Sequence, residues 1–152
     1  MFFAFEEMIR NEYIHKDIFE FEGGGSVEQL KVVYHTSEKP WTEGDKRKVI
    51  WICHALTANS DAADWWPELV GDGKFFDTEK YFVVCVNMLG SAYGSSGPAS
   101  TNPATGEPYY FDFPPISVRD IVRANALVRQ HLGIETIDLM IGGSIGGFQS
   151  VE

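Results

Sequence analysis

Three short apolar runs constrain the fold of this chain more than any other feature. Residues 48–54 and 81–87 are rich in Val, Ile and aromatic side chains without alternation, and residues 136–141 form a third run. A strand without alternation is typical of a sheet that helices cover on both faces. The runs therefore predict an α/β fold with a mostly parallel sheet, in which residues 136–141 are another buried strand.

The N-terminal part predicts a different kind of strand. Residues 17–22 and 27–35 alternate loosely between apolar and polar positions and are separated by Gly23-Gly24-Gly25. This pattern predicts an antiparallel pair at one edge of the sheet. About half of the formal net charge of −10 lies within the first 28 residues. Residues 1–16 are therefore expected to form an acidic, solvated arm.

Helices and loops can be placed between the strands. Residues 61–69 predict a short helix. A clearer helix follows Ser117, which can cap it together with Asp120, and Gly133 supplies its end. Residues 89–115 are crowded with Pro, Gly and Ser and predict a long loop. Residues 1–152 are accordingly interpreted as one incomplete domain, in which the acidic arm of residues 1–16 precedes the strands and loops of residues 17–152.

Composition excludes several classes of function. The chain is 44% apolar and strongly acidic, so it can fill a core and repels phosphate backbones, which argues against nucleic acid as a partner. No apolar run approaches the roughly 20 residues that cross a bilayer, and the N-terminus lacks an export signal. Cys53 and Cys85 each lie in an apolar run and are expected to be reduced core thiols of a cytoplasmic protein. Its four histidines and two cysteines are scattered, so no metal site is predicted.

The motif that carries chemistry is Gly142-x-Ser144-x-Gly146, which follows the run at 136–141 and opens a helix. This order fits a nucleophile elbow, where a serine on a strained strand-to-helix turn projects its hydroxyl and the next backbone N–H helps to hold an oxyanion. Ser144 is the predicted nucleophile and the Ile145 N–H one oxyanion donor. The alternative is a glycine-rich turn whose serine caps the helix. Phosphate-binding loops fail on residue identity, since Ser144 stands where a dinucleotide fingerprint needs glycine and no P-loop lysine is nearby.

A second oxyanion donor is expected from the loop after an earlier strand, where His54-Ala55-Leu56-Thr57 follows residues 48–53. The Leu56 N–H is the candidate. His54 is expected to stabilise this loop and not to act as the base, because the triad histidine follows the serine in the chain order of this architecture. His15, His35 and His131 have no motif around them and are expected at exposed or edge positions.

From about residue 48 to residue 152 the chain resembles the homoserine O-acetyltransferase family of α/β-hydrolase-fold enzymes. The matching residues are His54-Ala55-Leu56-Thr57, Trp65-Trp66, Leu69-Val70-Gly71, Asp77-Thr78, Tyr81-Phe82-Val83, Gly97-Pro98, Asn102-Pro103-Ala104-Thr105-Gly106, Asp112-Phe113-Pro114, Val118-Arg119-Asp120 and Gly142-Gly143-Ser144.

The resemblance implies acetyl transfer from acetyl-CoA to the hydroxyl of L-homoserine through an acyl-serine, in methionine biosynthesis. It implies Ser144 as nucleophile, the N–H groups of Leu56 and Ile145 as the oxyanion hole, and Thr57 and Asn87 as weaker candidates for substrate contact. It also implies no bound cofactor, with acetyl-CoA as co-substrate, and a homodimer for the full-length protein.

Three departures from the family pattern stand out. Ile145 replaces the usual Met, Ala58 a common Gly, and Gly90-Ser91-Ala92 a frequent Gly-Gly-Cys. The first is mild because the oxyanion role belongs to the backbone. The third lies in a loop near the site and leaves the acceptor, homoserine or serine, and the acyl group, acetyl or succinyl, open.

In this fold the triad order is Ser, then Asp or Glu, then His. The two partners and a helical lid are thus expected beyond residue 152, and the chain is interpreted as the N-terminal portion of an α/β-hydrolase fold, truncated after the nucleophile elbow. An unpaired sheet edge predicts that this portion alone is poorly stable or oligomeric. Two alternative functions stay open: an esterase of the same fold, and an inactive fragment that acts only as a folding or interaction module.

Overall fold

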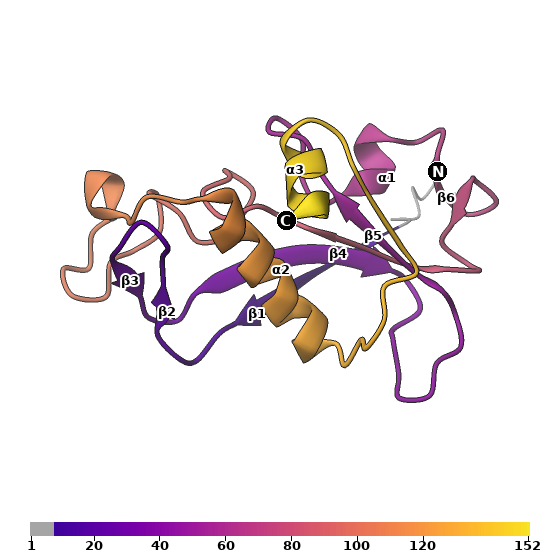
Figure 1. Ribbon diagram of the computed structural model, residues 1–152, viewed down its shortest axis with the longest axis horizontal. Helices are drawn as coiled ribbons and strands as arrows, with labels where there is room; N and C mark the ends of the chain where they lie inside the picture. The colour runs from indigo at the N-terminus through magenta and orange to yellow at the C-terminus, as the bar shows by residue number, and fades with distance from the viewer. Residues whose placement is uncertain (1–7) are drawn as a thin grey trace, which may run out of the picture.

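The structure, a computed structural model, describes residues 8–152 and is built on a five-stranded sheet (Figure 1). Its strands are β1 (Met8–Ile14), β4 (Lys31–Ser37), β8 (Phe82–Val86), β5 (Val49–Cys53) and β9 (Leu139–Gly142), in that spatial order. β1 and β8 both pair antiparallel with β4, whereas β5 lies parallel between β8 and β9. This confirms the predicted α/β fold, with parallel strands and an antiparallel N-terminal edge.

The identity of the antiparallel edge differs from the prediction. Residues 8–14 form β1 and pair along their whole length with β4, so for this segment the predicted solvated arm is wrong; residues 1–7 lie outside the described part. Met8 is buried, and the half-buried side chains of Ile9, Asn11 and Tyr13 alternate with exposed ones. The two charged side chains of β1 are among the exposed ones, which explains why a charged segment still forms a strand. The predicted pairing of 17–22 with 27–35 shrinks to a small separate ribbon of β2 (Phe19–Glu20) and β3 (Ser26–Val27).

Alternate side chains of the central strands fill two cores. Val49, Trp51 and Cys53 face one side of β5, where α2 (Val118–His131) packs; Ile50 and Ile52 face the other side. Cys85 belongs to the second core, so the two cysteines lie on opposite faces, and both are free thiols. Burial raises the pKa of each thiol, as expected for cysteines in a core.

Helix α2 is tied to the N-terminal ribbon at its start. Ser117 and Asp120 form the predicted capping box, and the buried Asp120 carboxylate also accepts the Glu22 N–H at 2.9 Å. Arg119 pairs with Glu22, and the Arg123 guanidinium stacks over the Phe19 ring at 4.6 Å. The Val118-Arg119-Asp120 motif is therefore structural, since it locks β2 and β3 against the helix.

Two predicted elements are shorter than expected. Helix α1 (Ala62–Trp65) ends early because Pro67 disfavours helical backbone at the residue before it. The strand predicted at 136–141 is β9, which begins only at Leu139. The preceding residue, Asp138, forms two hydrogen bonds with the Val49 backbone. Its N–H donates to the Val49 carbonyl, and its carboxylate accepts the Val49 N–H. Among the described residues β9 is half-exposed at the sheet edge, so its predicted burial is wrong there.

The remaining elements are small. β6 (Val70–Gly71) pairs with β7 (Phe76–Asp77) beside the second core, and the 3-10 turn η1 (Tyr110–Asp112) lies in the long loop after β8. That loop otherwise has only an isolated bridge between Thr101 and Pro108, which confirms the predicted loop at 89–115. Helix α3 (Ile145–Val151) follows β9 directly and stands next to α2 in Figure 1, with which it is in contact.

Candidate active site

Ser144 occupies a strained turn between β9 and α3. Its backbone has φ 56° and ψ −126°, and it is one of three non-glycine residues with positive φ within residues 8–152. Such a conformation persists only where the surroundings enforce it. The Ser144 side chain makes no capping hydrogen bond to α3, and the residue is exposed. The alternative of a serine that merely caps the helix is thus not what the structure shows.

The flanking glycines enforce this turn by close backbone contact. A Cβ on Gly142 would lie 2.2 Å from the Gly146 carbonyl oxygen, and a Cβ on Gly146 would lie 2.0 Å from the carbonyl oxygen of Cys53. Gly143, in contrast, has open space at its Cβ position. The first and last glycines of the motif are therefore required because α3 starts directly against the ends of β9 and β5.

The predicted second oxyanion donor follows the neighbouring strand. Cys53 and Gly142 are register partners in parallel strands, so the turns that follow them leave the same edge of the sheet side by side. Leu56 is 70% exposed in the first of these turns, and its N–H bonds to no acceptor among the described residues. The Ile145 N–H belongs to the first turn of α3 and has no partner within the helix. The topology brings both predicted donors to the edge of the sheet at which Ser144 lies.

His54 stabilises the loop that carries Leu56, as expected from its position before Ser144 in the chain. The ring is fully buried; its Nε2 accepts the Met88 N–H at 3.1 Å, so its Nδ1–H donates to the Ala55 carbonyl at 2.8 Å. Burial holds the pKa of His54 below its ordinary value, against the smaller opposing effect of the Ala55 hydrogen bond. A neutral histidine with both nitrogens occupied fixes the loop and does not serve as the base for Ser144.

The two weaker candidates for substrate contact, Thr57 and Asn87, differ in how exposed they are. Thr57 is exposed in the turn beside Leu56 and stays a prediction. Asn87 is 2% exposed; its side-chain oxygen accepts the Ser60 N–H at 2.7 Å and its amide nitrogen donates to the Tyr93 carbonyl at 3.2 Å. The Asn87 amide thus joins the loops around the site, and its contact with substrate stays a prediction.

Two of the other histidines lie as predicted: His15 follows the edge strand β1, and His131 is exposed at the end of α2. The prediction is wrong for His35, which is half-buried against Ser60 on β4, a strand that lies between β1 and β8. Within residues 8–152 no three His, Cys, Asp or Glu side chains gather as metal ligands would. None of the helices in this part of the chain is long and apolar enough to span a bilayer.

Sequence reasoning missed one feature near this edge of the sheet. A cavity of about 660 Å³ opens between residues 27–31 and the loop after β8, and Ser144 does not line it. The loop sequence Gly90-Ser91-Ala92-Tyr93-Gly94-Ser95-Ser96-Gly97 was the available signal, because several of its small polar residues line that cavity.

Comparison with known proteins agrees with the fold. Residues 48–152 match the family model of the alpha/beta hydrolase fold. A homoserine O-acetyltransferase of Trichormus variabilis is 46% identical over 144 residues, which are 94% of this chain and 40% of that protein. One of Chlorobaculum parvum is 48% identical over 138 residues, which are 90% of this chain and 38% of that protein.

Similar solved structures include both an esterase and a homoserine O-acetyltransferase. The crystal structure of esterase E22 superposes with a TM-score of 0.84 at 29% identity, covering 95% of this chain and 43% of that one. A homoserine O-acetyltransferase from Bacillus anthracis superposes with a TM-score of 0.80 at 30% identity, covering 93% and 41%. The chain spans about two-fifths of the length of the relatives it matches. Over this shared portion the chain resembles homoserine O-acetyltransferases, and it belongs to the α/β-hydrolase fold family.

Proposed function

We propose that this chain is the nucleophile-bearing portion of an acyltransferase that moves an acetyl group from acetyl-CoA to the hydroxyl of L-homoserine. The observation that carries the proposal is Ser144, held at φ 56° between β9 and α3. The turn that follows the neighbouring strand carries the Leu56 N–H, which bonds to no acceptor within residues 8–152. The relatives named homoserine O-acetyltransferase, at 41–48% identity, supply the reaction class.

The first half-reaction would acylate Ser144. Its Oγ attacks the thioester carbonyl carbon while its proton leaves to a base, and the Leu56 and Ile145 N–H groups hold the oxyanion. Collapse breaks the carbon–sulfur bond, and coenzyme A leaves as the thiol once it regains a proton. Since His54 is committed to Met88 and Ala55, the base comes from outside residues 8–152, in line with the Ser, acid, His chain order of this fold.

The second half-reaction would return Ser144 to its free form. The homoserine hydroxyl loses its proton to the same base and attacks the acyl-serine carbonyl, and the same two N–H groups hold the second oxyanion. The serine oxygen leaves and is reprotonated. Water would compete for the acyl-serine, so transfer depends on how well homoserine is seated.

The likeness to esterase E22 favours a second candidate, an esterase that passes the acyl group to water. The two differ in the acceptor step, which kinetics can isolate. In the complete gene product, coenzyme A release from acetyl-CoA should depend on L-homoserine and yield O-acetylhomoserine. Release at the same rate without the amino acid would establish hydrolysis instead.

The choice of acyl donor and acceptor can be tested in the same assay. Succinyl-CoA in place of acetyl-CoA, and L-serine in place of L-homoserine, should each lower kcat/KM; a preference for either alternative would reassign the substrate.

A substitution of the nucleophile tests whether the chain is an enzyme at all. Ser144→Ala should lower the rate of the reaction by roughly 10⁵-fold or more, as in other serine nucleophiles. An unchanged rate in that variant would leave the chain as a folding or interaction module. We also propose a cytoplasmic homodimer for the complete protein.

A further inference from the structure

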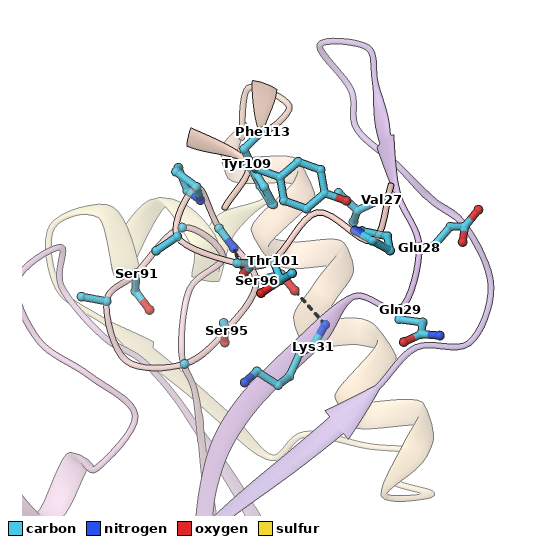
Figure 2. A pocket seen from close by; sticks show the side chains of 18 of the residues that line it. Val27, Glu28, Gln29, Lys31, Ser91, Ser95, Ser96, Thr101, Tyr109 and Phe113 are labelled. Atoms are coloured by element: carbon cyan, nitrogen blue, oxygen red, sulfur yellow. Dashed lines mark hydrogen bonds between the residues drawn. The ribbon is translucent and has the colours of Figure 1, made fainter. Parts of the chain in front are cut away.

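Two side chains within residues 8–152 hold buried polar atoms that form no hydrogen bond, Ser91 and Gln149. Ser91 lies on the loop that borders the cavity in Figure 2, and only a single hydroxyl is unpaired there. Gln149, on α3, is the more unfavourable case, because both the oxygen and the nitrogen of its amide are unpaired and the residue is 3% exposed. The proposed acyl transfer assigns no role to Gln149.

Gln149 faces the interior one turn after the start of α3. It follows Ile145, which packs against the core on the α2 side, by four residues, and Gly146, whose backbone touches the end of β5, by three. Residues three or four apart lie on the same face of a helix, with Cβ atoms about 5–6 Å apart. Long helical side chains also point back toward the N-terminus of their helix. The Gln149 amide is thus directed toward the contact between Gly146 and β5.

A buried carbonyl that lacks a donor lies at that contact. A Cβ on Gly146 would be 2.9 Å from the carbonyl oxygen of His54. His54 is fully buried, and its backbone oxygen accepts no hydrogen bond within residues 8–152. An acceptor without a donor and an amide without an acceptor are therefore about one helical turn apart. Each is unfavourable by itself, and one hydrogen bond from Nε2 of Gln149 would satisfy both.

The His54 carbonyl belongs to the turn that carries the predicted oxyanion donor. This oxyanion turn, residues 54–57, leaves the end of β5, and its Leu56 N–H follows the His54 carbonyl by two peptide units. The His54 ring fixes one side of the turn through Met88 and Ala55. The backbone carbonyl has no such tie, although the plane of its peptide sets the direction in which the turn continues. A group that fixes this carbonyl therefore also fixes the Leu56 N–H.

We propose that Gln149 is a positioning residue for the oxyanion turn: its Nε2–H donates to the His54 carbonyl while the Leu56 N–H holds the oxyanion. Hydrogen bonds of a catalytic site are often unmade in the free enzyme and form in the reaction complex, which accounts for the unpaired amide in the free chain. A bond made only in the transition state lowers the barrier and leaves substrate binding unchanged. Gln149 itself touches no substrate, because its polar atoms are buried.

A substitution that keeps the size of Gln149 but removes its amide tests this role. In the complete gene product, Gln149→Met should lower the maximal rate of Ser144 acetylation about fivefold to tenfold, the usual effect of one hydrogen bond. The acetyl-CoA concentration that gives the half-maximal rate should change by less than about twofold. The thermal midpoint should stay or rise, because Met buries no unpaired polar group. An unchanged maximal rate, or a midpoint that falls together with the rate, would overturn the proposal.

Ser150→Ala is the matched control on the next residue of α3, because the Ser150 hydroxyl already donates to the Gly146 carbonyl inside the helix at 2.9 Å. It should keep the parent rate, and a loss as large as that of Gln149→Met would refute a specific role for the amide. The positioning role rests on the proposed acyl transfer, and the parent protein separates the two. A parent that does not acetylate Ser144 contradicts the proposed function; a parent and a Gln149→Met variant that acetylate it equally fast contradict the positioning role alone.

Discussion

β8 and β9 are both apolar strands, yet they have opposite surroundings. β8 lies between β4 and β5, and all five of its residues are buried. Within residues 8–152, β9 pairs with β5 alone, and Leu139 and Met140 are 43% and 38% exposed. Apolar composition thus determines that a segment forms a strand, while position in the sheet determines how much of it is buried. The strand that carries Ser144 is the less protected one.

The largest expected effect is a difference between β8 and β9 in how much a substitution lowers the free energy of unfolding. Phe82→Ala removes a ring that is 1% exposed between β4 and β5, and we expect a loss of about 3–5 kcal/mol in the free energy of unfolding. Leu139→Ala on β9 should cost less than about 1 kcal/mol, because much of that side chain is already in water. Urea unfolding of both variants checks this. Equal losses would show that β9 is as well packed as β8.

The next effect concerns the elbow at the end of β9. Gly146→Ala places a methyl group 2.0 Å from the Cys53 carbonyl, so we expect a loss of about 1–3 kcal/mol or more and of activity, since the backbone cannot yield cheaply. Gly143→Ala is the control, with open space and no positive φ. Thermal unfolding and the acetyl-CoA assay together measure both effects. A harmless Gly146→Ala would contradict the close packing of α3 on β5.

Much of this architecture could be predicted from local pattern. Unalternating runs located β5 and β8, and the Ser117 and Asp120 pair located the start of α2. β1 could not be predicted in the same way, because acidic residues gather in the N-terminal segment around it and no apolar run marks it, although it pairs with β4 along its whole length. Its pairing is a tertiary effect that composition opposes.

An intermediate effect is expected at the capping carboxylate of Asp120. Burial by itself would raise its pKa, but the N–H groups of Ser117 and Glu22 outweigh burial and hold the pKa below its usual range. A lowered carboxyl pKa contributes stability that is complete above about pH 4 and is lost as pH falls through the lower, folded pKa. Asp120→Ala should cost about 1–3 kcal/mol at pH 7.

The same residue gives a pH control. Asp120→Asn removes the titrating group, so its loss of stability relative to the parent chain should shrink as pH falls from about 5 toward 2. Unfolding at several pH values measures this. A constant difference across that range would mean that the Asp120 charge does not stabilise the start of α2.

The smallest effect is the pH dependence contributed by His54. Its pKa is lowered by burial, so the unfolded chain takes up a proton below about pH 6.5 while the folded chain stays neutral. Stability should therefore decrease as pH falls from about 6.5. His54→Gln, which can still accept the Met88 N–H, should reduce that slope, whereas His131→Gln at an exposed position should keep it. Unchanged slopes in both variants would contradict the neutral, buried state of His54.

The part of the candidate site that could be predicted from the sequence is the turn that carries Ser144 and the role of His54. Gly142-x-Ser144-x-Gly146 implied the strained turn, and chain order implied a structural role for His54. For Asn87 substrate contact stays a prediction, because the sequence does not reveal whether an amide is already bonded, here to Ser60 and Tyr93. The cavity beside Ser91 was missed because two segments distant in sequence form it.

Ser144 is central to the proposed reaction as the nucleophile that accepts the acyl group. The most direct test mixes the complete gene product with acetyl-CoA without any acceptor, quenches it in acid within seconds, and maps the modified peptide by mass spectrometry. We predict one acetyl group on Ser144, absent in Ser144→Ala and removed by later addition of L-homoserine. Acetylation elsewhere, or coenzyme A release that persists in Ser144→Ala, would contradict the account.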